Sequence, residues 1–294
     1  MKIAIIGVGP AGSNILKNII NHKNFSKKIE VHLFETRPKL GRGLPYDDDN
    51  LSKMLNIKAE KMSLDPKEKY DFTDWLDENK DNPYGKEQMV ARPIYGEYIS
   101  EFYKKYYKHP QVKIYKLTVE DIQVIKNDDK IEYKIRDLRG WRNDIYDVVF
   151  LTMGHPIYND FYDLDGHKGF IYNPYPLDGK LDSIKADKQV AIIGSGATGI
   201  DLFRYFLSQI NLKNPLKMLL RDTAFKLPKI EYKGKKIKPS IDQQWLEAHA
   251  SDLDLDLILT TIKNDFDKKN VDFNKVYEKY KGETIVDLRL TLDE

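Results

Sequence analysis

Short apolar runs that end in glycine-rich turns occur twice along the chain. Residues 3–6 form a continuous apolar run, which is typical of a parallel strand buried on both faces. After the glycines, apolar residues recur with helical spacing over 15–20, which predicts a helix that packs one face against a sheet. A second strand, glycine turn and helix are predicted over 190–207. The pattern therefore predicts the same local structure at two places almost two hundred residues apart.

The first glycine turn has the G-x-G-x-x-G spacing of a dinucleotide-binding site. Its first glycine permits a tight turn, its second lets the backbone approach a pyrophosphate, and its third lets the helix pack close to the strand. The N-terminus of that helix would favour the negative charge of the phosphates. The alternative is a structural strand–turn–helix with no ligand. We call residues 7–12 the first cradle; its candidate binding residues are Gly7, Gly9, Pro10, Ala11 and Gly12.

An acidic residue follows the next predicted strand at the offset that a dinucleotide site requires. The run "KIEVHLFE" predicts this strand, and it ends at Glu35, with Thr36 next. A carboxylate at this offset accepts hydrogen bonds from ribose hydroxyls. Glu35 and Thr36 are therefore candidate cofactor-binding residues, although Glu35 suits any adenine ribose.

The second glycine turn has the same spacing but is followed by a different residue. The next strand, "LKMLL", ends at Arg221, which occupies the place of Glu35 and can accommodate a 2′-phosphate. NADPH is therefore favoured over NADH. NADH stays an alternative, because Asp222 follows directly and Arg221 could instead be a solvated residue at the strand end. The lysine-rich stretch 226–238 favours a charged surface hairpin over a phosphate site. We call residues 194–199 the second cradle; its candidate residues are Gly194, Ser195, Gly196, Ala197, Thr198 and Gly199.

Composition excludes several classes of function. The 48 basic and 46 acidic residues leave a net charge of +2, which argues against nucleic-acid or membrane-surface binding. The absence of cysteine excludes disulfides and redox dithiols. No apolar run suits a signal peptide or a membrane helix, so we expect a cytoplasmic protein. The histidines lack paired ligand spacing and 47–49 is expected to be a solvated turn, so no metal is expected.

Four further segments resemble one family of flavoproteins. They are "GRGLPYDDDN", "MLNIKAEKMSL", "ARPIYGEYISEFY" and "YDVVFLTMGHP". With the two cradles, they make the chain similar to the FAD-NAD(P)-binding family of bacterial proteins with two dinucleotide-binding domains. That family is distantly related to flavin monooxygenases and amino-acid N-hydroxylases. The resemblance implies FAD at the first cradle and NAD(P)H at the second.

The resemblance also implies further cofactor-binding residues. In "GRGLPY", a glycine permits close approach and an arginine supplies a fork for phosphate or a flavin carbonyl. The alternatives are an amphipathic helix on the sheet for the segment from Arg92 to Tyr98, and an ordinary buried strand with a glycine turn for 152–154. The implied residues are Arg42, Gly43, Asn56, Val119, Thr152, Met153 and Gly154.

The expected fold is α/β, with two Rossmann-like dinucleotide-binding domains, parallel sheets and an inserted antiparallel strand region. The FAD-binding domain is expected over 1–156, a connection over 157–186, and the NAD(P)-binding domain with a helical C-terminal part over 187–294. In that part 251–266 favours a helix over a strand, with Ser251 and Asp254 as a capping box.

The expected function is an FAD-dependent NAD(P)H oxidoreductase, with a monooxygenase as one form, acting on a small-molecule substrate or acceptor. No catalytic acid or base stands out. The family's glycine–aspartate motif is not found before Glu294, so the sequence also fits a chain that needs a protein partner or a missing C-terminal segment. A non-catalytic dinucleotide-binding module would fit the two cradles as well, and so would an enzyme whose first cradle binds a nucleotide other than FAD.

Overall fold

The structure, a computed structural model, describes residues 1–79, 83–85, 88–127, 130–155, 159–160, 163–220 and 239–280. Its contacts divide the chain into two compact units, Met1–Thr223 and Ala224–Glu294. Both cradles lie in the first unit. The domain boundaries predicted at 156 and 187 also fall within that unit, and they stay a prediction.

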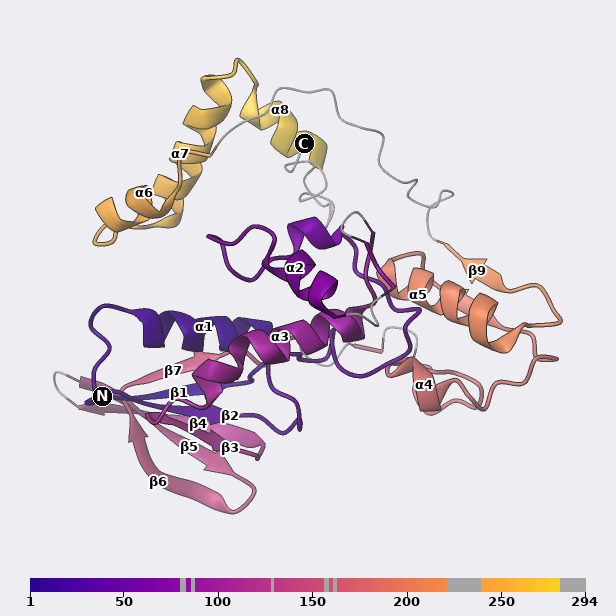
Figure 1. Cartoon of the computed structure of the whole chain (residues 1–294), viewed down its shortest axis with the longest axis horizontal. Coiled ribbons are helices and arrows are strands. Elements are labelled where there is room, and N and C mark those ends of the chain that lie inside the picture. The colour runs from indigo at the N-terminus through magenta and orange to yellow at the C-terminus, as the bar shows by residue number, and fades with distance from the viewer. Residues whose placement is uncertain are drawn as a thin grey trace. The chain divides into compact units, whose positions relative to one another are not determined.

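The first unit contains a four-stranded parallel sheet (Figure 1). Its two middle strands are the apolar runs that flank the first cradle, and side chains such as Ile5 and Leu33 are fully buried. Burial on both faces explains why these strands are continuously apolar. In spatial order the strands are β3 (Val112–Tyr115), β2 (Glu30–Phe34), β1 (Lys2–Ile6) and β7 (Val148–Leu151).

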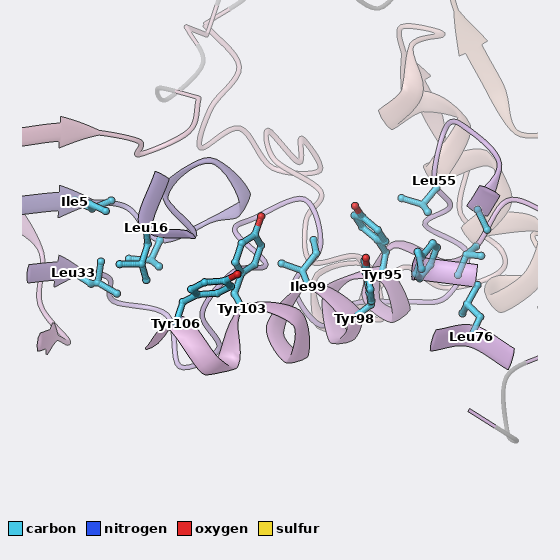
Figure 2. Packing of buried hydrophobic residues seen from close by; sticks show 14 of the residues in the cluster. Ile5, Leu16, Leu33, Leu55, Leu76, Tyr95, Tyr98, Ile99, Tyr103 and Tyr106 are labelled. Atoms are coloured by element: carbon cyan, nitrogen blue, oxygen red, sulfur yellow. The ribbon is translucent and has the colours of Figure 1, made fainter. Parts of the chain in front are cut away.

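Helices cover one face of this sheet. The predicted apolar stripe of the first helix packs here, with Leu16 fully buried among residues of the longest helix. Figure 2 shows how this cluster continues along that helix from Tyr106 to Tyr95 and on to Leu55 and Leu76. The helices that contribute to this cluster are α1 (Pro10–Asn21), α2 (Asp71–Glu78) and α3 (Arg92–Tyr107), with a 3-10 turn η1 (Ala59–Lys61).

An antiparallel sheet covers the other face. Its Ile135 and Tyr146 pack against Ala4, Ile6 and Phe34 of the parallel sheet. The first part of the unit therefore has three layers, in the order helices, parallel sheet, antiparallel sheet (Figure 1). The strands of the antiparallel sheet are β4 (Val119–Asn127), β5 (Lys130–Asp137) and β6 (Gly140–Tyr146).

A smaller parallel pair carries the second cradle. A separate core joins Leu177, Ile192 and Tyr205. These observations confirm the predicted α/β class, with parallel sheets and an inserted antiparallel region. The elements are α4 (Leu177–Lys180), β8 (Ala191–Ile193), α5 (Ala197–Tyr205), a π turn η2 (Phe206–Ile210) and β9 (Lys217–Leu219).

The second unit is helical where it is described. A helix over the aspartate- and leucine-rich segment is confirmed, but Asp254 caps it, because its carboxylate accepts the Leu257 N–H at 2.7 Å. The predicted pairing of Ser251 with Asp254 as a capping box is therefore wrong. The helices are α6 (Gln243–Ala248), α7 (Leu255–Asp267) and α8 (Phe273–Tyr280). Within the described ranges, no helix is both long and apolar enough to span a bilayer. The lysine-rich stretch 226–238 lies outside them.

Candidate functional site

The turn between β1 and α1 can be made only with glycine at two of its positions. Gly7 has φ +88°, and its N–H donates to the Phe34 carbonyl at 2.9 Å. A Cβ on Gly7 would lie 2.4 Å from the Thr152 carbonyl oxygen, and one on Gly12 would lie 2.2 Å from the Gly7 oxygen. These two residues therefore fix the sharp turn and the close packing of helix on strand.

Gly9 is the N-cap of α1, and the helix begins at Pro10. The Ser13 N–H donates to the Gly9 carbonyl at 3.0 Å, so the amides of Ala11 and Gly12 lie before the first helical hydrogen bonds. Ala11 is exposed at this helix end. The N-terminus of α1 therefore offers free N–H groups and the positive end of the helix dipole to an anion.

Glu35 lies at the end of β2, directly beside this turn. Its side chain is buried, with one carboxylate oxygen accepting the Val8 N–H at 2.9 Å and the other accepting the Arg37 N–H at 3.0 Å. Each oxygen keeps a further lone pair with which it can accept a ribose hydroxyl. Thr36 is exposed, and its hydroxyl lies 3.5 Å from the same carboxylate.

The end of β7 forms the wall behind the first cradle. The Thr152 N–H donates to the Ile6 carbonyl at 2.8 Å, and its hydroxyl donates to the Gly7 carbonyl at 2.6 Å. The threonine therefore holds both Ile6, at the end of β1, and Gly7, the first glycine of the cradle. Met153 is exposed and Gly154 has φ +83°, so the chain turns away here.

The segment from Gly41 to Gly43 lies against the first cradle through its backbone. The Gly41 N–H donates to the Val8 carbonyl at 2.7 Å, and a Cβ on Gly9 would lie 3.3 Å from the Gly43 Cα. This placement fits the prediction that Gly43 lies beside a bound cofactor.

The Arg42 side chain is buried and contacts other parts of the protein. Its Nε donates to Ser100 Oγ at 3.1 Å and its Nη1 to Asp48 Oδ1 at 2.6 Å. In this structure the guanidinium therefore joins α3 to the acidic residues 47–49. Its predicted contact with phosphate or flavin stays a prediction.

Asn56 and Val119 lie in two different parts of the unit. Asn56 is exposed, and its side-chain oxygen accepts Nη2 of Arg92 at 3.4 Å. Val119 begins β4 and packs with the cluster around Phe34, on the face of the sheet that the antiparallel strands cover. The Arg92 contact links Asn56 to α3 rather than to the first cradle itself.

The second cradle repeats the geometry of the first. Gly194 has φ +101°, and its N–H donates to the Leu219 carbonyl at 2.8 Å, as Gly7 donates to the end of β2. A Cβ on Gly199 would lie 2.5 Å from the Gly194 oxygen, which matches the packing of Gly12 on Gly7.

The helix start is repeated as well. Gly196 caps α5 in the extended conformation that Gly9 has at α1, and its carbonyl accepts the Ile200 N–H at 3.1 Å. Ser195 lies in the turn, and the exposed Ala197 and Thr198 begin the helix. Arg221 lies outside the described residues.

The two cradles differ in what surrounds them. β1 has a strand on each side, whereas β8 pairs only with β9 among the described residues. Ile6 is therefore 5% exposed and its counterpart Ile193 is 54% exposed. No described atom lies within 4 Å of a Cβ placed on Gly194 or Gly196. Among the described residues, no residue encloses the second cradle as Thr152 encloses the first.

A buried polar cluster between the cradles was not predicted. It contains Lys53, Asp49, Arg92, Asp201 and Tyr175, joined by ion pairs and hydrogen bonds. Asp49 is 1% exposed, so the expectation of a fully solvated turn over 47–49 is wrong. A signal was present in Asp201, since a charged residue at a core-facing helix position needs a partner.

A cavity of about 690 Å³ lies beside this cluster. It lies between the segment that follows Arg42 and the end of α5, and it combines an arginine with apolar and hydroxyl side chains. The residues that line it include Asn50, Ser52, Met54, Arg204 and Leu207.

The first cradle fits a dinucleotide on three grounds. Free N–H groups at the start of α1 can meet the phosphates, the Glu35 carboxylate can accept ribose hydroxyls, and Gly9 faces the Gly43 backbone without a side chain between them. The second cradle repeats the first of these features.

Comparison with known proteins gives matches to one protein family and to several flavin enzymes. The family model described as FAD-NAD(P)-binding matches residues 4–156, just over half of the chain. The uncharacterized protein YdhS of Escherichia coli (strain K12) is 26% identical over 215 residues. That alignment covers 68% of this chain and 38% of YdhS, so the chain spans well under half of that relative's length.

Solved structures share the fold at low sequence identity. The reduced form of ornithine hydroxylase PvdA from Pseudomonas aeruginosa aligns with a TM-score of 0.57 and 13% identity, covering 97% of this chain and 70% of that one. DfoA bound to FAD, the cadaverine monooxygenase of desferrioxamine biosynthesis from Erwinia amylovora, gives 0.54 and 13%, covering 91% and 65%. The open structure of cyclohexanone monooxygenase gives 0.50 and 15%, covering 77% and 40%.

Proposed function

The chain belongs to the FAD-NAD(P)-binding family, and we propose that it is an FAD-dependent NAD(P)H oxidoreductase. The proposal assigns FAD to the first cradle and NAD(P)H to the second. A more specific version of the proposal is a monooxygenase, in which oxygen is the electron acceptor. Otherwise the acceptor is a small organic molecule.

The observation that carries the proposal is the repetition of one turn geometry in two different surroundings. Both turns begin with a glycine of positive φ, and both helices begin at an extended glycine. The first cradle is enclosed by Thr152 and the 41–43 segment, which suits a cofactor that stays bound. The second is open in the described part of the chain, which suits a donor that binds and leaves.

The chain's own residues would hold and orient the two dinucleotides. The amides at the start of α1 would bind the FAD diphosphate, and Glu35 would orient its adenosine ribose. The start of α5 would bind the diphosphate of NAD(P)H, and Arg221 is the basis for preferring NADPH over NADH. When bound, FAD supplies the redox chemistry, because it can take a hydride from NAD(P)H and pass its electrons to the acceptor.

A second candidate is a dinucleotide-binding module that needs a partner for turnover. The unpaired side of β8 in the described residues and the exposed Ile193 favour it, because another strand would cover both. A third candidate is an enzyme whose first cradle binds a nucleotide other than FAD, since Glu35 would accept any adenine ribose.

Matched glycine substitutions test which dinucleotide each cradle takes. Gly9 and Gly196 have negative φ and extended backbone, so the backbone conformation allows alanine at both positions. A Cβ on Gly9 would also lie 3.3 Å from the Gly43 Cα, so the 41–43 segment must shift slightly in that variant. The new methyl group would lie where the backbone must approach a diphosphate. We expect Gly9→Ala to weaken FAD binding by about tenfold or more, equivalent to ~1.4 kcal/mol, and to leave NADPH binding unchanged. Gly196→Ala should do the reverse.

Fluorescence titrations of FAD and NADPH against each variant measure the two affinities. Thermal unfolding of the same samples checks that both variants are folded. The assignment is contradicted if Gly9→Ala weakens NADPH binding and leaves FAD binding intact, or if neither substitution changes either affinity.

A further inference from the structure

Buried charges join the 49–56 segment and the start of α3 to α5, the helix of the second cradle, through side chains that none of the nucleotide-binding motifs requires. The exposed fractions of the Lys53, Asp49 and Asp201 side chains are 3%, 1% and 2%, and that of Arg92 is 14%. Charged side chains are rarely buried unless they are paired and hydrogen-bonded. Each of these four side chains is paired with an opposite charge, and the cluster therefore needs both the residues up to the start of α3 and those of α5.

Arg92 is the residue that reaches both sides. It lies at the start of α3, where its Nε donates to the Met54 carbonyl at 2.8 Å and its Nη2 to Asn56 Oδ1 at 3.4 Å. Its Nη1 lies 3.1 Å from Oδ2 of Asp201. One planar guanidinium therefore binds the segment that carries Asn56 and, at the same time, the helix of the second cradle.

Asp201 receives this arginine within α5, two residues after Gly199 of the second cradle. The same carboxylate oxygen accepts the Tyr175 hydroxyl at 2.8 Å. Burial raises the pKa of the Asp201 carboxyl, and the Arg92 charge opposes that rise. Arg92 and the Tyr175 hydroxyl thus both favour the charged form of this buried carboxylate, against the effect of burial.

A second link runs parallel to the first. Asp49 accepts the Leu177 N–H at 2.7 Å and pairs with Lys53 at 3.3 Å, while the Lys53 Nζ lies 4.9 Å from the centre of the Tyr175 ring. The 49–56 segment is therefore held at two points to the part of the unit that contains the second cradle. Such pairs fix a single arrangement of the groups that they join, because leaving one charge buried alone is unfavourable.

We propose that Arg92 is a positioning residue, which fixes α5 and its cradle to the 54–56 segment and so sets the donor dinucleotide toward the flavin. The inference rests on the proposed function for its last clause only. Loss of the Arg92 guanidinium would leave each cradle able to bind its nucleotide but would let the two cradles move relative to each other. An ordinary stabilising ion pair would affect stability alone.

Hydrogen–deuterium exchange on the full chain without nucleotide tests the link directly. The variants are Arg92→Met, Arg92→Lys and Asp201→Asn. The matched control is Arg142→Met, since Arg142 pairs with a buried aspartate at the same 3.1 Å within the antiparallel sheet. We expect Asp201→Asn, a change in α5, to raise exchange over 54–56 by about tenfold, because the segment loses its anchor.

The remaining variants follow from the same geometry. Arg92→Met should raise exchange over 54–56 and over 197–201, and Arg92→Lys should restore little, because an ammonium cannot bind three acceptors in the plane of a guanidinium. Arg142→Met should change neither segment. The link is overturned if Asp201→Asn leaves 54–56 unchanged, or if the control produces the same increase. Asp201→Asn keeps the side chain's size, so the test does not depend on Arg92→Met folding.

Measurements with bound nucleotides on the same variants test whether Arg92 sets the donor dinucleotide toward the flavin. We expect Arg92→Met to slow reduction of bound FAD by NADPH about tenfold, with both dissociation constants changed less than about threefold. An unchanged rate in a variant with raised exchange would overturn the positioning role. A wild-type chain that takes up no FAD contradicts the proposed function instead, and the exchange experiment then decides alone whether Arg92 links the two segments.

Discussion

His32 shows how a single buried residue makes this fold sensitive to acid. It lies in β2 at 1% exposure, with Nδ1 2.8 Å from the Tyr146 hydroxyl and Nε2 2.7 Å from Glu30 Oε1. Burial lowers the pKa of His32 below 6.5, and its hydrogen bond to Glu30 opposes this only in part. A hydrogen bond from Lys113, followed by that from His32, lowers the pKa of Glu30 to about 2.

The stability of the chain should therefore fall as the pH falls. The folded state binds the His32 proton more weakly than the unfolded state, so this contribution is present above pH 6.5 and is lost as the pH falls through the folded-state pKa. Glu30 adds a second loss between pH 4.5 and about 2. Urea unfolding at pH 7.5 and 5.5 should show a smaller decrease for His32→Gln than for the wild type. Equal decreases would refute this role, and the exposed His167→Gln is the control.

Among the elements, α3 determines how the segment beside the first cradle is held. A Cβ on Gly96 would lie 2.0 Å from the Tyr46 carbonyl oxygen, so the helix and the 41–48 segment touch through their backbones. Ser100 of the same helix accepts Arg42 Nε and donates to the Leu40 carbonyl at 2.8 Å. The helix is therefore the support on which the Gly43 backbone meets Gly9.

Gly96→Ala should weaken both the fold and the first cradle. The clash with a backbone oxygen outweighs the ~1 kcal/mol gain in helix propensity, and we expect a net loss of about 2 kcal/mol in unfolding free energy. FAD affinity should fall as well, because the segment beside Gly9 must move. Gly85→Ala is the control, since its Cβ would meet no atom of the described residues within 4 Å, and stability should stay equal or rise by up to about 1 kcal/mol. Equal stability of the two variants would contradict this packing.

At the level of elements, the sequence predicted what local periodicity controls. The strand–glycine–helix repeats, the hairpin strands and the helix over 255–267 all follow from spacing along the chain. Contacts across long sequence separations were missed, such as Arg92 with Asp201 and Ser13 with the Tyr107 hydroxyl at 2.6 Å. Periodicity shows that a position faces inward but not which distant residue meets it there.

Over the whole molecule, the two cradles stand in sheets of different size. The first belongs to a sheet of four strands within three layers, whereas the second belongs to a pair of strands in the described part of the chain. The glycine spacing predicted both cradles, and the resemblance to a flavoprotein family implied FAD at the first and NAD(P)H at the second.

In the proposed function, electrons pass from NADPH at the second cradle to FAD at the first. The most direct measurement is the absorbance spectrum of the full chain, loaded with FAD and then titrated with NADPH without oxygen. We predict flavin absorption bands that bleach on addition of NADPH, and more slowly with NADH. Two results would contradict this function: the protein neither retains nor takes up flavin, or NADPH does not bleach the bound flavin. Either result would favour a nucleotide-binding module that needs a partner.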